Sequence, residues 1–196
     1  VCLYAGQREN AFNYSTEVIK ASNNGIFPFV DRSLVNGTAQ DPDRIFSPEV
    51  LFALSDSQRG ELFEEYFDPS LAPNMVFRME TDLLEQTIYG GTGTGGNLDD
   101  YRCRSNWISS GSARYFYKYS DMTESGRIEN TMIPLLRLGE MYLIAAESQS
   151  NSLANGVSYI NTLRKNRGVS NLQTLTTTLL QLSLIHISEP TRLRCI

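Results

Sequence analysis

The sequence lacks several features that mark particular classes of protein. It has no run of eighteen apolar residues, so no segment is predicted to span a membrane. It has no basic excess, because 17 Lys and Arg against 22 Asp and Glu give a formal net charge of −5, which argues against a nucleic-acid partner. Its three cysteines, Cys2, Cys103 and Cys195, suit neither a disulfide framework nor a metal cluster. With 41% hydrophobic residues, the chain is nevertheless expected to fold around a core.

The two ends of the chain do not resemble those of a complete protein. Val1 already lies inside a predicted helix, with no preceding Met and no basic and apolar segments of a signal peptide. We therefore expect the true start to be missing. At the other end, residues 183–196 (SLIHISEPTRLRCI) resemble the conceptual translation of a sequencing adapter. We interpret them as a non-native tail, with an irregular native tail as the alternative.

Histidine is absent outside this tail, which contains the only one, His186. Without it, the chain cannot build a Ser-His-Asp or Cys-His arrangement, or a zinc site that uses histidine. The glycine-rich segment 89–97 lacks the Lys-Ser/Thr that completes a phosphate-binding loop. These absences predict a protein that is not an enzyme and has no cofactor or metal.

Paired carboxylates leave one enzymatic alternative open, a glycoside hydrolase, which needs two of them about 5–10 Å apart across a sugar. Glu64 and Glu65, and Asp99 and Asp100, are candidates by residue type only. Adjacent residues on a helix diverge by about 100°, so Glu64 and Glu65 are not expected to face one substrate. This alternative is disfavoured.

Two regions have the spacing of amphipathic helices. Residues 3–21 are predicted to form a helix with one face made of Ala11, Tyr14, Ser15 and Val18. Residues 133–168 predict a helical hairpin that ends at Gly168. Its two apolar stripes are Leu138, Met141, Tyr142 and Ala145 on the first helix, and Ala154, Val157, Ile160 and Leu163 on the second.

The middle of the chain is rich in turns. Residues 49–54 form a short apolar run typical of a strand, and residues 57–67 predict a brief amphipathic helix. From Arg114, the sequence RYFYKY alternates and predicts another strand, with Tyr115, Tyr117 and Tyr119 on one packed face. The region is therefore expected to hold loops with a few short regular elements.

The hairpin carries the most specific motif in the chain. Residues 133–147 read IPLLRLGEMYLIAAE, and residues 159–168 read YINTLRKNRG. Both segments resemble motifs of the SusD/RagB family, namely Ile-Pro and Arg followed by Glu-x-Tyr-Leu-x-x-Ala-Glu, and Tyr-Ile-Asn-x-x-Arg-x-x-Arg-Gly. Residues 4–19, 49–54 and 115–119 resemble further segments of that family in the same order, so the resemblance covers residues 1–182.

This resemblance implies a mainly α fold, in which tetratricopeptide-like helical hairpins carry an irregular, loop-rich insertion and a few short strands. It divides the chain into part of a helical hairpin (1–22), a loop-rich ligand region (23–132), a helical hairpin (133–168) and the start of a further helix (169–182). The tail 183–196 lies outside it.

The resemblance also implies a function. Members of the family are non-catalytic lipoproteins of the outer membrane, which bind an oligosaccharide or other nutrient and pack against a TonB-dependent transporter. The lipid-anchored cysteine of the family is not present in this sequence, so membrane attachment applies to the full-length protein only. The alternative is a helical-repeat module that binds another protein and no small ligand.

Aromatic residues gather in the middle region, where five of the ten tyrosines and the only tryptophan fall between residues 89 and 119. Flat rings stack on the apolar faces of sugars, while polar neighbours bind the hydroxyl groups. Tyr89, Tyr101 and Trp107 are the candidate ligand-binding residues. Each could equally be a core anchor. Asp99, Asp100 and Arg102 are their candidate polar neighbours, or simply solvate a loop.

Overall fold

The computed structural model describes residues 1–35, 41–90, 98–124, 126–149 and 153–172. By contacts, the chain divides into two compact units. Unit 1 comprises Val1–Pro28 and Arg137–Ile196, and unit 2 comprises Phe29–Leu136. The described part is mostly helical with a few short strands, which confirms the predicted fold class. The sequence-based domain boundaries stay a prediction, as do the continuing helix and the tail, which fall mainly outside the described residues.

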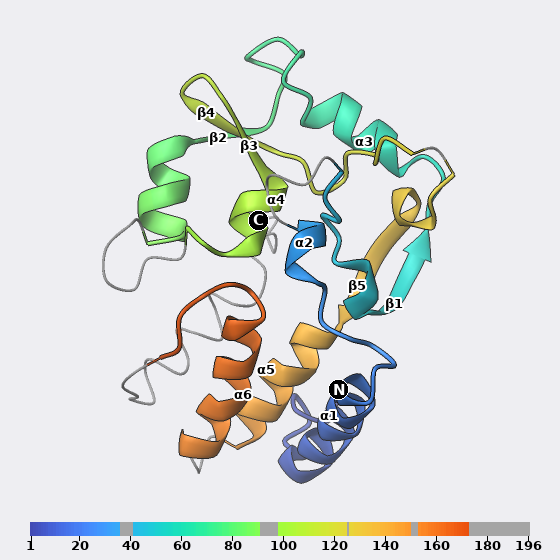
Figure 1. The fold of residues 1–196 in the computed structure, drawn as a ribbon, viewed down its shortest axis with the longest axis vertical. Helices are drawn as coiled ribbons and strands as arrows, with labels where there is room; N and C mark the ends of the chain where they lie inside the picture. Colours follow the sequence, from blue (N-terminus) through green and yellow to red (C-terminus); the bar gives the residue numbers. More distant parts are fainter. Residues whose placement is uncertain (36–40, 91–97, 125, 150–152, 173–196) are drawn as a thin grey trace. The chain divides into compact units, whose positions relative to one another are not determined.

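Unit 1 is built from three helices that lie side by side in Figure 1. They are α1 (Arg8–Asn23), α5 (Leu138–Ser148) and α6 (Leu153–Lys165). Helix α5 packs against both of the others. A β-carbon on Gly156 of α6 would lie 2.9 Å from the carbonyl oxygen of Ala146 on α5, so the two backbones approach closely because residue 156 has no side chain.

The buried face of α1 differs from the predicted one. Ala11 and Ser15 are buried as expected, but Tyr14 is 62% exposed, so its predicted place in the core was wrong. The buried stripe continues through Ile19 and Ser22. A step of four residues turns the helix by about 400°, so this stripe drifts away from Tyr14. Burial of Ser15 costs little because its hydroxyl donates to the Phe12 carbonyl at 3.0 Å.

The hairpin stripes are largely confirmed, since Leu138, Tyr142 and Ala145 are buried on α5, and Val157, Ile160 and Leu163 on α6, whereas Ala154 is exposed. Gly168 ends the second helix as predicted. It has a φ of 75°, and the Val169 amide donates to the Arg164 carbonyl at 3.0 Å.

The first hairpin helix begins later than predicted. Residues 132–137 form strand β5 (Met132–Arg137), which pairs with β1 (Val50–Ser55) in a two-stranded sheet. Pro134 lacks an amide hydrogen, which is tolerated in an edge strand and is unfavourable inside a helix. The predicted strand at residues 49–54 is confirmed by β1.

Unit 2 also holds a three-stranded antiparallel sheet in the order β2-β4-β3. Its strands are β2 (Arg78–Glu80), β3 (Trp107–Ser110) and β4 (Ala113–Phe116). Trp107 pairs with Phe116, and Tyr115 pairs with both Arg78 and Ile108. The predicted tyrosine face was too long, because β4 ends at Phe116 and leaves Tyr117 and Tyr119 outside the strand. The Tyr117 amide instead donates to the Asn106 carbonyl at 2.8 Å.

Short helices complete unit 2 (Figure 1). They are α2 (Arg32–Val35), α3 (Arg59–Tyr66), α4 (Tyr101–Asn106), a π-helical segment η2 (Leu83–Ile88), and the 3₁₀ turns η1 (Ser47–Glu49) and η3 (Ile128–Asn130). Helix α3 confirms the predicted helix within residues 57–67.

Candidate functional site

The predicted polar neighbours of the aromatic residues lie at the start of α4. Asp100 caps this helix, because its Oδ1 accepts the Arg102 amide at 2.9 Å. The Arg102 guanidinium then folds back onto the same carboxylate, donating from Nε at 3.0 Å and from Nη2 at 2.6 Å. Both residues are buried. Their hydrogen-bonding groups are therefore occupied by each other, which makes them scaffold for α4.

The neighbouring Asp99 is exposed and forms an ion pair with Arg104 of α4. Asp99 and Asp100 thus differ in exposure and have separate partners. A glycoside hydrolase needs two carboxylates that both reach one sugar. The buried, paired state of Asp100 does not suit that role.

Two of the three candidate ligand residues come together in one apolar cluster. Tyr89 and Trp107 both pack with Leu84 and Cys103. Tyr89 is only 3% exposed, and its burial raises the pKa of its hydroxyl far above the usual range. A stacking platform needs a free ring face, so in this conformation Tyr89 acts as a core residue that supports Trp107.

Trp107 and Tyr101 keep part of their surfaces accessible. Tyr101 packs against a different cluster, made of Val30, Val35 and Phe46. The Trp107 ring lies 4.9 Å from the Phe116 ring, centroid to centroid, at an interplanar angle of 51°. The structure therefore separates Tyr101 from the cluster that Tyr89 and Trp107 share.

A chain of aromatic contacts extends from Trp107 to the surface of unit 2. From Phe116 the contacts run to Phe67 at 5.6 Å, from Phe67 to Phe77 at 6.1 Å, and from Phe77 to Tyr66 at 5.9 Å. Trp107 is half-buried at one end, while Phe77 is 64% exposed at the other. Sequence reasoning missed Tyr66 and Phe77. The available signal was the aromatic density of residues 63–77, which hold four aromatic residues in one short stretch.

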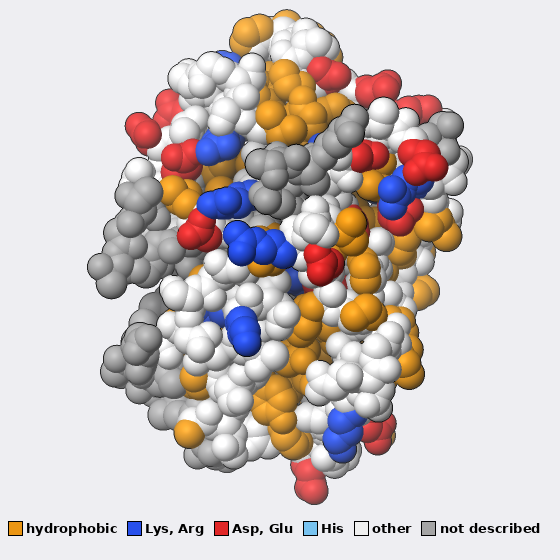
Figure 2. Space-filling model, viewed as in Figure 1, with side chains coloured by type: hydrophobic (Ala, Val, Ile, Leu, Met, Phe, Trp, Pro, Cys, Tyr) orange, Lys and Arg blue, Asp and Glu red, His pale blue; other side chains and the backbone are white. Residues whose placement is uncertain are grey.

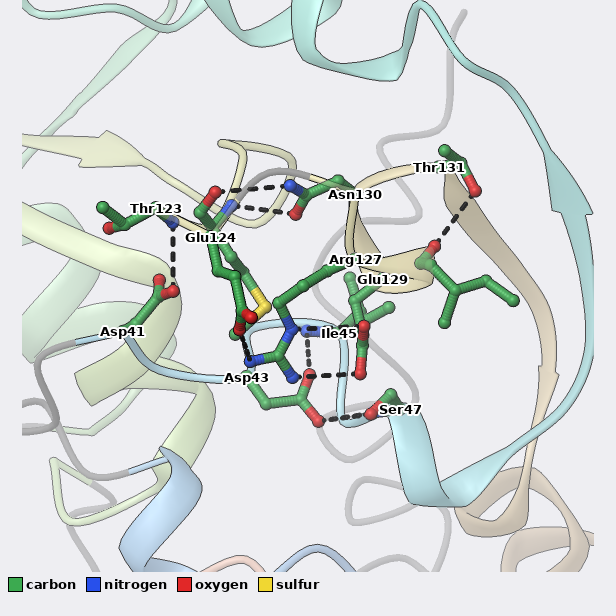
Figure 3. A network of polar contacts seen from close by, with 12 residues as sticks. Asp41, Asp43, Ile45, Ser47, Thr123, Glu124, Arg127, Glu129, Asn130 and Thr131 are labelled. Carbon is green, nitrogen blue, oxygen red and sulfur yellow. Dashed lines mark hydrogen bonds and ion pairs between the residues drawn. The ribbon is translucent and has the colours of Figure 1, made fainter.

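A network of polar contacts joins two loops of unit 2 (Figure 3). The Asp43 carboxylate accepts the Ile45 amide at 3.2 Å, and the Ser47 amide and hydroxyl at 2.7 and 2.8 Å. Desolvation by burial outweighs these bonds and raises the pKa of Asp43. Opposite, Arg127 donates to Glu129, which lowers the pKa of that carboxyl.

Further bonds tie the same loops together. The Thr123 amide donates to Asp41 at 3.0 Å, and the Met122 amide donates to the Asn130 side chain at 2.9 Å (Figure 3). A cavity of about 10 Å³ lies beside this network, lined by Asp43, Arg44, Arg59, Lys118 and Glu129 among others. That space fits about one water molecule, so a sugar ring cannot enter it. We assign this network to the scaffold of unit 2.

Among the described residues, no group of three or more His, Cys, Asp or Glu side chains could hold a metal ion. Within the same residues, no helix is both long and apolar enough to cross a membrane.

Comparison with known proteins identifies the architecture. No model of a known protein family matches the chain, and no curated protein matches it. Among solved structures, it matches a SusD-like carbohydrate-binding protein from Bacteroides vulgatus with a TM-score of 0.56 and 19% sequence identity. The fold is SusD-like.

The match covers 95% of this chain and 38% of the Bacteroides protein. The SusD-like chain thus spans well under half of that relative's length. At this level of identity the likeness establishes the fold, so any function has to be argued from the residues of this SusD-like chain.

Proposed function

We propose that the protein is a non-catalytic, glycan-binding subunit of a nutrient-uptake complex. The observation that carries this proposal is the SusD-like fold combined with an aromatic-rich unit 2, whose rings reach the surface. The structural neighbour is itself described as carbohydrate-binding. Aromatic rings with nearby polar groups suit the alternating apolar and hydroxylated surfaces of sugars.

Within this proposal, Trp107 and Tyr101 are the ligand-binding residues taken from the sequence, and Tyr89 supports the Trp107 ring from the core. Trp107 and Tyr101 are half-buried on a short strand and a short helix, so their positions are fixed while part of each ring stays accessible to a ligand. Delivery of a glycan to a transporter requires no covalent chemistry, so no catalytic residue is proposed.

The proposed setting is the outer membrane, with a TonB-dependent transporter as partner and a lipid anchor in the full-length protein. The resemblance of the hairpin motifs and the SusD-like fold support this setting. A long sequencing read through the locus tests it. A reading frame that continues past codon 182, begins with a lipoprotein signal and neighbours a transporter gene is the expected result. An isolated frame that ends at Ile196 would favour the helical-repeat module instead.

Glycan binding is tested directly by affinity electrophoresis of the purified protein through gels that contain dextran, inulin, galactomannan, arabinoxylan, amylopectin, polygalacturonate or chondroitin sulfate. The expected result is retardation in at least one gel, with no release of reducing ends after prolonged incubation. Release of reducing ends would support the alternative hypothesis that the protein is a glycoside hydrolase. Unretarded migration in every gel would contradict the proposed function.

A further inference from the structure

An exposed apolar surface lies on unit 2 at the end of the aromatic chain that starts at Trp107. It consists of Tyr66, Met75 and Phe77, which are 37%, 63% and 64% exposed, and we refer to it as the Phe77 surface. Figure 2 shows hydrophobic side chains gathered at the upper end of the molecule, over the loop between α3 and β2. An aromatic ring that folding leaves mostly in water indicates a contact with something else.

The Phe77 surface is held in place before any ligand arrives. The Phe77 amide donates to the Tyr66 carbonyl at 2.7 Å, which fixes the two residues side by side. Their ring centroids lie 5.9 Å apart at an interplanar angle of 37°, so the two rings are in contact. Phe67 lies behind Phe77 at 6.1 Å.

The loop that carries these residues is tied down as well. The Asp68 side chain accepts the Ser70 amide at 2.7 Å, and the Met75 amide donates to the Ala72 carbonyl at 2.8 Å. Binding to rings that are already fixed loses little conformational entropy, so this geometry favours affinity.

Polar groups border the rings in the way that a sugar requires. The Tyr66 hydroxyl hydrogen-bonds the Glu65 carboxylate, which raises the pKa of Tyr66. With the Tyr66 hydroxyl donating to Glu65, the remaining lone pairs of the two groups offer acceptors for hydroxyl groups at the edge of the rings. A purely apolar partner would have to desolvate this carboxylate without replacing its hydrogen bonds, which is costly.

The exposed charges of the helix beside the surface are negative. Helix α3 exposes three carboxylates, Glu61, Glu64 and Glu65, and its one cation, Arg59, is buried. Figure 2 shows acidic side chains beside the hydrophobic patch. Uronate or sulfate groups would be repelled at this border, whereas neutral sugars are not penalised.

We propose that the Phe77 surface is a binding site for a neutral glycan, with the ring faces of Phe77 and Tyr66 stacking on a sugar and Glu65 accepting its hydroxyl groups. This inference rests on the proposed function and deepens it, since it adds a site and excludes acidic polysaccharides as ligands. An apolar protein surface is the competing occupant.

The test compares Phe77→Ala with the control Phe52→Ala in the same seven gels, after far-UV circular dichroism has shown that both variants are folded. Phe52 of β1 is a matched control because it is an aromatic residue of the same unit with 52% exposure. We expect the wild type to be retarded by one of the five neutral polysaccharides and by neither acidic one. Phe77→Ala should weaken that binding at least tenfold, and Phe52→Ala should change it less than twofold.

The remaining outcomes separate this inference from the proposed function. Equal binding by both variants, or binding of polygalacturonate or chondroitin sulfate alone, would overturn the Phe77 site and leave glycan binding standing. No binding by the wild type would overturn both. Loss of self-association in Phe77→Ala by analytical ultracentrifugation, with glycan binding unchanged, would assign the surface to a protein contact instead.

Discussion

The carboxylate of Asp100 accepts three hydrogen bonds from one residue, Arg102, at 2.6–3.0 Å, and both side chains are buried. Replacing Asp100 by Ala would leave a buried guanidinium without its main counter-charge and would remove the cap of α4. Breaking a buried pair in this way costs about 3–5 kcal/mol. Urea unfolding followed by circular dichroism should therefore show a large loss of stability in Asp100→Ala.

The neighbouring residue provides the control for this prediction. Asp99 also pairs with an arginine, Arg104, but both of these side chains are well exposed. Exposed pairs contribute at most about 1 kcal/mol, so Asp99→Ala should unfold close to the wild type. Similar losses in the two variants would mean that the Asp100–Arg102 pair is solvated in solution.

Gly156 is predicted to be essential for the close packing of α5 and α6. Ala is usually better than Gly inside a helix by about 1 kcal/mol. Here a β-carbon would lie 2.9 Å from the Ala146 carbonyl oxygen, which belongs to the backbone and cannot move aside cheaply. We expect Gly156→Ala to destabilise unit 1 by about 1–3 kcal/mol in thermal or urea unfolding.

Asn155→Ala serves as the comparison because residue 155 is exposed in the same turn of α6. That variant should be neutral or slightly more stable than the wild type. If Gly156→Ala gained stability as well, the two helices would not approach each other as closely as the structure indicates.

The helical hairpin could be predicted from the sequence because its signals are local. The apolar stripes of α5 and α6 repeat over several turns, and Gly168 supplies the left-handed conformation that ends α6. The start of α5 could not be predicted in this way. Residues 132–137 form a strand because β1, about eighty positions earlier, pairs with them. Tyr14 is exposed although the spacing put it on the apolar face of α1. The sequence of one helix does not show which of its sides packs against the neighbouring helices.

The candidate site was only partly accessible to sequence reasoning, for a related reason. The density of aromatic residues between 89 and 119 made Trp107 a candidate, but could not show that Tyr89 is buried in the same cluster. Phe77 and Tyr66 meet through a backbone hydrogen bond across a loop of ten residues. Neighbours of this kind are set by tertiary structure, so single-sequence patterns do not reveal them.

Burial of Cys103 predicts a pH-dependent stability. Desolvation raises the pKa of the Cys103 thiol from 9.0 to about 11. A folded-state pKa above the unfolded one gives stability that is complete below pH 9.0 and is lost as the pH rises toward 11. At about 1.4 kcal/mol for each pKa unit, this group accounts for a loss of roughly 2 kcal/mol by pH 10.5.

The measurement compares urea unfolding of the wild type and Cys103→Ala at pH 8 and pH 10.5. The variant lacks the thiol, so its stability should fall less over this interval, and the difference between the two proteins should shrink by roughly 2 kcal/mol. A constant difference would show that Cys103 is already solvated or does not ionise in this range.

Trp107 is predicted to stabilise unit 2 as well as to bind ligand. Its ring contacts Phe116 at 4.9 Å and packs against the cluster of Leu84, Tyr89 and Cys103. Trp107→Ala should therefore lose about 2–4 kcal/mol, less than a fully buried tryptophan because part of the ring is accessible. Trp107→Phe should recover most of that stability, since an aromatic ring can still pack on Phe116.

The two roles of Trp107 can be separated because it is the only tryptophan in the chain. Its fluorescence reports on unit 2 alone, so urea unfolding followed at its emission gives the stability of that unit in the wild type. A retarding polysaccharide added to the folded protein should shift or quench the same emission if the ring touches sugar. The variant Trp107→Phe tests whether the indole contacts the glycan. If this variant folds like the wild type but binds tenfold more weakly, the indole lies in the glycan site. Wild-type affinity in that variant would restrict Trp107 to the core.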